Sequence, residues 1–202
     1  MGSVVKVRPA GVVHWWYPGA GCVTVTDQDG HAIGHGCARP ARDSRGNRPG
    51  PGPRGAGGNR DGPAFTPAGP GPPGGYGTWD LLIGDLHLRV SLGPIPVTDC
   101  DHRYESAGYQ PSDTLRHLVE IRDGKCTMPV CVRHAQRCDF EHAVPWHQGG
   151  RTCCCNGGCR CRHDHRIKQS PGWSVTQPMP GYHQWTTPAG RTFTTEPMRH
   201  PI

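Results

Sequence analysis

The chain has 202 residues and a formal net charge of +6, with 30 glycines, 22 prolines and only 34% hydrophobic residues. So much glycine and proline leaves too little apolar surface for one compact fold throughout the chain. No segment approaches the length of a transmembrane helix, and residues 1–21 lack the apolar run of a signal peptide, so the sequence predicts a cytoplasmic protein rather than a membrane or secreted one.

The N-terminal half predicts two strand pairs that flank a linker. Residues 22–26 and 31–34 surround the turn sequence 27–30 and predict a β-hairpin, so segment 1–38 is interpreted as a hairpin segment and a candidate remnant of an upstream domain. Residues 39–75 are rich in glycine, proline and arginine, with Phe65 as their only aromatic residue. This composition predicts a disordered linker. Within segment 76–105, residues 79–83 and 86–90 predict a second strand pair, which we expect to pair with the first across the linker.

The C-terminal segment 106–202 predicts a small mixed domain, so the expected fold class is α+β. Pro111 and Ser112 predict the start of a helix over residues 112–122, with Leu115, Leu118 and Val119 on one face. Residues 173–175 and 183–185 predict a terminal hairpin that residues 190–195 continue.

Four polar residues in this segment have the layout of a one-metal site for phosphodiester hydrolysis. Glu141 and His142 are adjacent, Asn156 follows 14 residues after His142, and His165 follows 23 residues after it. A neutral imidazole can accept a proton from water near neutral pH, which makes His142 the candidate general base. Glu141 and His165 are the candidate ligands of Mg²⁺ or another divalent ion with open positions. We place Glu141 and His142 at the end of a strand, and expect the amide of Asn156 to hold the intervening loop through backbone hydrogen bonds.

The cysteines predict a second, structural metal site. Cys126, Cys131 and Cys161 supply three thiolates, which with one more ligand would close a tetrahedral zinc site. The fourth ligand stays open among His163, Asp164 and Cys155: ligand chemistry favours His163, and position along the motif favours Asp164. Eleven cysteines in a reducing compartment favour metal over disulfides. Cys138 is expected to be a small buried apolar residue.

From about Cys100 to its end the chain resembles the HNH endonuclease module of the actinobacterial HNH/13E12-repeat-like protein family. The matching stretches cover about half of the chain: Cys100 to Arg103, Leu115 to Leu118, Arg122 and Asp123, Cys126 to Cys131, Cys138 to His142, Gly149 to Thr152, Cys161 to Lys168, and Trp185 to Arg191. The resemblance implies a ββα-metal (HNH, His-Me finger) nuclease fold in which Glu141 and His165 bind the catalytic metal, His142 is the general base and Asn156 is the middle asparagine. Many relatives in the wider superfamily have aspartate at the position of Glu141, and many have His or Cys at that of Asp164.

A nuclease of this kind needs a basic surface for nucleic acid, with DNA as the expected partner. Arginine suits bidentate phosphate contacts. The predicted phosphate-binding rim consists of Arg151, Arg160, Arg162, Arg166 and Lys168. Two other functions stay open: a zinc-stabilised nucleic-acid-binding module without catalysis, and a secreted binding protein held by disulfides.

Overall fold

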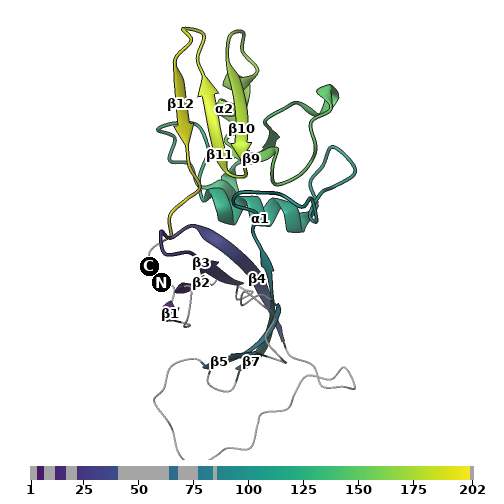
Figure 1. Cartoon of the computed structure of the whole chain (residues 1–202), viewed down its shortest axis with the longest axis vertical. Helices are drawn as coiled ribbons and strands as arrows, with labels where there is room; N and C mark the ends of the chain where they lie inside the picture. The colour runs from purple at the N-terminus through teal and green to yellow at the C-terminus, as the bar shows by residue number, and fades with distance from the viewer. Residues whose placement is uncertain are drawn as a thin grey trace, which may run out of the picture. The chain divides into compact units, whose positions relative to one another are not determined.

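The computed structural model describes residues 22–40 and 86–200, together with strands at 4–6, 12–16, 64–67 and 77–83 (Figure 1). Side chains are described for residues 22–38, 77–80 and 88–200. The chain divides into two compact units. Unit 1 comprises Met1–Asp29, Ile33–Pro94 and Ile202, and unit 2 comprises Gly30–Ala32 and Ile95–Pro201.

Unit 1 is built on a seven-stranded sheet with the strand order β1-β2-β3-β4-β7-β6-β5. Its strands are β1 (Val4–Lys6), β2 (Val12–Trp16), β3 (Cys22–Thr26), β4 (Ala32–Pro40), β5 (Ala64–Pro67), β6 (Gly77–Ile83) and β7 (Leu86–Pro94). Alternation along β7 buries Leu88, Val90 and Leu92 and exposes Arg89 and Ser91. The buried residues of β7 pack with two residues of β3 and β4, so one face of the sheet forms an apolar core.

Strands lie where both strand pairs were predicted, and the two pairs join across the linker. Ala38 of β4 pairs with Val90 of β7. Part of the linker prediction is wrong, because β5 lies inside it and pairs with β6. Extended residues with a hydrogen-bonding partner can form a strand despite a weak apolar signal. Residues 41–63 and 68–75 of the predicted linker lie outside the described residues.

Unit 1 also contains a disulfide, between Cys22 of β3 and Cys37 of β4. This pair differs from the expectation that the cysteines serve metal rather than disulfides, although Cys22, His35 and Cys37 also lie close enough together to hold a metal ion. The two residues lie on neighbouring strands, a placement that brings side chains close enough for a bond.

The main segment of unit 2 starts at Ile95, before residue 106, where the sequence placed the domain boundary. Ile95 packs with Ala32 and Leu118 in a small apolar cluster. Helix α1 spans Asp113–Asp123, close to the predicted range, and the hydroxyl of Ser112 caps it by accepting a hydrogen bond from the Leu115 backbone N–H at 3.2 Å. Gly124 ends the helix with a left-handed φ of 62°.

The remaining elements of unit 2 are short. They are η2 (Ala135–Arg137), β8 (Asp139–His142), η3 (Trp146–Gln148), β9 (Gly157–Arg160), α2 (Arg162–Lys168), β10 (Ser174–Met179), β11 (Tyr182–Thr186) and β12 (Thr192–Thr195). Strands β8 and β9 form a two-stranded sheet, and β10, β11 and β12 form a three-stranded sheet that Figure 1 shows in yellow and green. The fold is therefore mixed α+β, with few helices and several small sheets. Among the described residues, no helix is long and apolar enough to cross a membrane.

Candidate active site and metal groups

The candidate catalytic residues lie on the β8–β9 hairpin and on helix α2. Glu141 pairs with Gly158 and His142 with Gly157 at the end of the hairpin where the loop joins the two strands, and α2 contacts both strands. The two glycines are required by close packing: a Cβ at Gly157 would collide with the Phe140 ring, and one at Gly158 with the His183 ring. Glu141 and His142 occupy the end of their strand, as the sequence predicted.

The structure brings Glu141 and His165 into direct contact. The Oε2 atom of Glu141 lies 2.8 Å from Nε2 of His165. The other carboxylate oxygen, Oε1, accepts a hydrogen bond from the Lys168 ammonium at 2.7 Å. The side chains of Glu141 and Lys168 are each only 8% exposed. Burial lowers the pKa of Lys168, and the Glu141 carboxylate opposes that shift.

His165 also contacts a second carboxylate. Its Nδ1 lies 3.1 Å from Oδ2 of Asp139, two residues before Glu141 on the same face of β8. His165 and Asp139 line a polar cavity of about 260 Å³, whose other walls include Arg116 and Arg162. Cationic side chains and two carboxylates thus meet around one imidazole.

His142 is almost fully buried, with 3% of its surface exposed. Its ring stacks on Tyr109 with a centroid distance of 5.3 Å, and its Nε2 lies 2.9 Å from the hydroxyl oxygen of Thr152. Burial lowers the pKa of the His142 imidazole, the Glu141 carboxylate opposes this shift, and the Lys168 ammonium reinforces it. The imidazole is therefore neutral near pH 7.

Asn156 makes the backbone hydrogen bonds expected of it. Its Oδ1 accepts from the Val144 N–H at 2.8 Å, and its Nδ2 donates to the carbonyls of Val144 at 3.0 Å and Arg151 at 2.9 Å. These bonds close the loop between β8 and β9. The loop also requires Gly150, because a Cβ there would collide with the Val144 carbonyl and the Asn156 amide.

Only part of the predicted phosphate-binding rim is at the surface. Arg151, Arg162 and Arg166 are exposed. Arg160 is fully buried, donates to the Glu141 carbonyl at 3.1 Å and stacks over the Trp185 ring. Lys168 is buried against Glu141, so the prediction is wrong for Arg160 and Lys168. Both side chains stabilise the hairpin instead of facing solvent.

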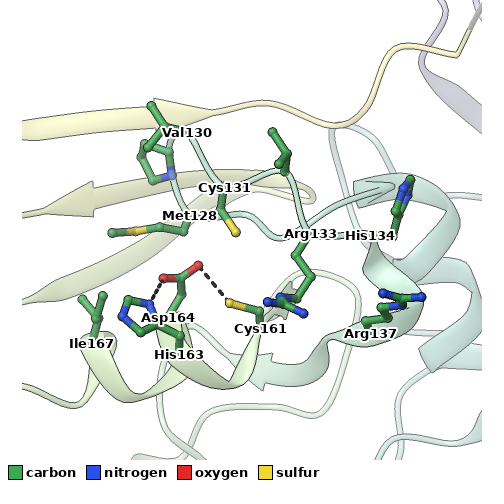
Figure 2. A pocket seen from close by; sticks show the side chains of 12 residues that line it. Met128, Val130, Cys131, Arg133, His134, Arg137, Cys161, His163, Asp164 and Ile167 are labelled. Carbon is green, nitrogen blue, oxygen red and sulfur yellow. Dashed lines mark hydrogen bonds and ion pairs between the residues drawn. The ribbon is translucent and has the colours of Figure 1, made fainter.

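Three of the predicted zinc ligands converge with Asp164. We call Cys126, Cys131, Cys161 and Asp164 the first group; their ligand atoms all lie within 4.8 Å of one another. Figure 2 shows Cys131, Cys161 and Asp164 of this group from close by. Oδ2 of Asp164 lies 3.2 Å from Sγ of Cys126 and 3.1 Å from Sγ of Cys161. The group could hold a metal ion.

His163, the first choice for the fourth ligand, lies outside this group. Its side chain is 80% exposed, and its Nδ1 lies 2.8 Å from Oδ1 of Asp164 on the side away from the thiols. Cys161 caps α2, and a residue three positions later lies on the same face of the helix, whereas a residue two positions later does not. The structure therefore places Asp164 rather than His163 with the thiols.

The pKa values of Asp164 and of the thiols around it are shifted from their ordinary values. Burial would raise the pKa of Asp164, but hydrogen bonds from His163 and Cys161 lower it to about 2. Burial raises the pKa of Cys131 to about 12. A hydrogen bond with Cys138, together with burial, raises that of Cys126 further. Thiols so close together cannot ionise together without a cation among them.

Cys155 and Cys138 lie outside the first group. Cys155 lies beside His102, with Sγ 3.7 Å from its Nδ1, and is not part of the first group. Cys138 is half-buried rather than buried, packs against the apolar cluster of Leu115 and Val119, and donates to the His134 carbonyl.

Sequence reasoning missed a buried ion pair beneath the hairpin. Arg122 bonds Asp123 at 2.8 Å and donates to the carbonyls of Cys154 and Gly157, while Asp123 accepts from the Cys159 N–H. These bonds attach α1 to β9 and to the loop just before it. The contact of Thr152 with His142 was missed as well. Arg122, Asp123 and Thr152 all lie in stretches that match the resembled family, and that match was a signal that could have identified them.

Three curated proteins were found to be similar to part of this chain. Uncharacterized protein MT2160 of Mycobacterium tuberculosis strain CDC 1551 / Oshkosh and uncharacterized protein Rv2100 of strain ATCC 25618 / H37Rv are each 40% identical over 90 residues, which is 44% of this chain. Uncharacterized protein Rv3776 of strain H37Rv is 39% identical over 90 residues. The match covers only 16% or 17% of the length of these relatives. No family model and no solved structure matches the chain.

Proposed function

We propose that unit 2 is a metal-dependent HNH endonuclease that hydrolyses phosphodiester bonds, with β8, β9 and α2 as its ββα-metal motif. The observation that carries the proposal is the contact of Glu141 with His165 at 2.8 Å, one residue from the buried imidazole of His142. A carboxylate, an imidazole ligand and a neutral base thus converge from one hairpin and one helix.

The position of His165 between two carboxylates supports a cation at this point. Its Nδ1 faces Asp139 and its Nε2 faces Glu141, so an imidazole nitrogen and carboxylate oxygens lie close enough together to share one ion. A divalent ion between Glu141 and the ring nitrogen would satisfy both groups. Neighbouring ligands of an octahedral Mg²⁺ are about 3 Å apart, given bonds of about 2.1 Å, which is close to the observed separation.

The residues around this point have distinct chemical roles in the proposal. Thr152 donates its one hydroxyl proton to the Tyr109 carbonyl at 3.4 Å, so its oxygen accepts from Nε2–H of His142. This tautomer leaves Nδ1 of His142 unprotonated and able to take a proton from water. The divalent ion, when bound by Glu141 and His165, stabilises charge that develops on the phosphate and the departing oxygen.

The charges at the polar cavity suit a nucleic-acid backbone, and we propose DNA as the partner. Arg116 and Arg162 line this cavity beside His165. Arg166 is exposed one residue after His165. Guanidinium groups bind phosphate oxygens in a bidentate way and would place the phosphate next to the candidate metal ligands.

We propose that the first group binds a structural zinc ion. Three thiolates and one carboxylate complete a tetrahedral zinc site, and four protein ligands leave no position for substrate. Reduced thiols there fit the cytoplasmic location expected from sequence, whereas the Cys22–Cys37 disulfide is typical of oxidising compartments.

The test is nicking of supercoiled plasmid by the full chain with Mg²⁺, Mn²⁺ or Ni²⁺. His142→Ala should lower the rate by a factor on the order of 10² to 10⁴, since it removes the general base. His147→Ala is the matched control, because His147 is an exposed histidine five residues away. Wild-type nicking by His142→Ala, or equal losses in both variants, would contradict the mechanism.

A nucleic-acid-binding module without catalysis is the second candidate. The Lys168 ammonium already pairs with one oxygen of Glu141, and a base that is 3% exposed has little access to water. In that case the wild-type chain would bind DNA in a salt-dependent way and nick it with none of the metals.

A further inference from the structure

A second cluster of soft ligands lies in unit 2, apart from the first group. It consists of Cys100, His102, Cys153 and Cys155, whose ligand atoms all lie within 4.8 Å of one another. We call it the second group. Its members come in two pairs, Cys-x-His and Cys-x-Cys, from segments about fifty residues apart in sequence.

The distances within the second group fit a tetrahedral ion. Sγ of Cys153 lies 3.4 Å from Sγ of Cys100 and 3.4 Å from Nδ1 of His102, and Sγ of Cys155 lies 3.7 Å from that same Nδ1. Bonds of about 2.3 Å to sulfur and about 2.0 Å to nitrogen place tetrahedral ligands about 3.5 to 3.8 Å apart. A disulfide, by contrast, would bring the two sulfurs to about 2.05 Å.

The backbone of the first pair supports a bound ligand independently. His102 has a φ of 59°, in the left-handed region that few residues other than glycine adopt. Burial of the side chain does not offset this backbone strain, because the residue is exposed. The conformation directs Nδ1 of His102 at Cys153 and Cys155, and such strained residues are frequent where a side chain must reach a ligand.

We propose that the second group is a second structural zinc site. Three thiolates and one imidazole prefer zinc to hard ions such as Mg²⁺, and four protein ligands close the coordination sphere. The site would fasten the segment that follows β7 to the loop between β8 and β9. It does not rest on the nuclease proposal, since metal binding can be measured without cleavage.

The loop between β8 and β9, which the second zinc ion would hold, also positions His142. Next to the second group, the Ser106 N–H donates to the Thr152 carbonyl at 2.9 Å, and Arg151 pairs with Glu105 at 2.9 Å. The Thr152 side chain then contacts Nε2 of His142. The zinc would thus act on His142 through Thr152, as a positioning element rather than a catalytic one.

The test is the zinc content of the full chain, purified under reducing conditions and measured by mass spectrometry of the metal. Cys155→Ser should lower it by one ion per chain relative to the unaltered chain. Cys154→Ala is the matched control: Cys154 is the neighbouring cysteine but packs in an apolar cluster and is outside the second group, so its content should be unchanged. Cobalt reconstitution should show the same loss in the visible absorption of thiolate-bound Co²⁺.

A second variant guards against misfolding of Cys155→Ser. Asparagine tolerates a left-handed φ, so His102→Asn removes the imidazole ligand without new backbone strain. It should release one ion per chain to a chelator at least tenfold faster than the unaltered chain. Equal zinc content and equal release in both variants would overturn the proposal, as would a Cys100–Cys153 disulfide found by thiol alkylation of the reduced-purified protein.

Discussion

The pairing of Glu141 with Lys168 allows the stability role of Glu141 to be separated from its proposed metal role. Both side chains are 8% exposed and their charged atoms are 2.7 Å apart. Glu141→Ala leaves the Lys168 ammonium buried without its carboxylate, and removal of one partner of a buried ion pair costs about 3–5 kcal/mol. For a unit of this size, at about 5 °C for each kcal/mol, the melting temperature should fall by roughly 15–25 °C.

The double variant Glu141→Ala/Lys168→Met removes both charges and should recover most of that loss. Buried ion pairs replaced by apolar groups of similar size are often no less stable. Nicking should stay abolished in the double variant, because the carboxylate ligand is still missing. The assays are urea denaturation and plasmid nicking of the same preparations, with Lys168→Met alone to complete the cycle.

Two results would refute this reasoning. If the double variant regains both stability and nicking, Glu141 serves the fold and is not the metal ligand, and Asp139, the other carboxylate at His165, becomes the one to test. If Glu141→Ala alone is as stable as the unaltered chain, the ion pair is not buried as the structure describes.

Three further predictions concern single side chains. Asp164→Ala should lower the zinc content by one ion per chain. His163→Ala should keep that ion but weaken its affinity roughly tenfold, because His163 only orients the Asp164 ligand. Metal analysis of the two variants distinguishes these outcomes. Burial, with Arg160 and Arg122 nearby, lowers the pKa of His183 well below its ordinary value. The unfolded chain therefore protonates His183 more readily than the folded chain. The free energy of unfolding should be highest above about pH 6.5 and should fall as the pH drops below that value. Urea titrations from about pH 8 to 5 should show a smaller fall in His183→Gln. Thr152→Val should slow nicking at least tenfold and cost about 1–3 kcal/mol, since it leaves the buried Nε2–H of His142 without an acceptor; unchanged nicking would show that this contact does not position the base.

Local signals in the sequence predicted much of the element order. The Ser112 cap and the apolar spacing of Leu115 and Val119 predicted α1, and alternation over residues 86–90 predicted β7. Helix geometry could also have identified the fourth residue of the first group. Cys161 caps α2 and Asp164 follows three positions later, so the two residues share a face of the helix. The prediction of His163 instead followed the preference of zinc for imidazole.

The burial of Arg160 and Lys168 could not be predicted in the same way. Strand β9 has the sequence Gly-Gly-Cys-Arg, in which glycines carry no side chain to reveal a period of two, and all four residues are buried. A run of basic residues is ordinarily a solvated face, so its charges indicated a surface. Contacts such as Thr152 with His142 depend on the path of the loop, which no local pattern encodes.

The composition of unit 2 explains why its candidate site rests on polar bonds and metal groups. Its two apolar clusters are small, and its largest fully buried side chains include Arg122, Arg160 and His183 beside Trp185. A unit with so little apolar core needs other cross-links, and metal ions bound by distant segments can supply them. The first group joins the turn after α1 to α2, which carries His165; the second joins the start of the unit to the loop that carries Thr152. If both bind zinc, the two ions fix two segments that form the candidate site, so a catalytic role for Mg²⁺ can be tested only in protein whose zinc has been retained.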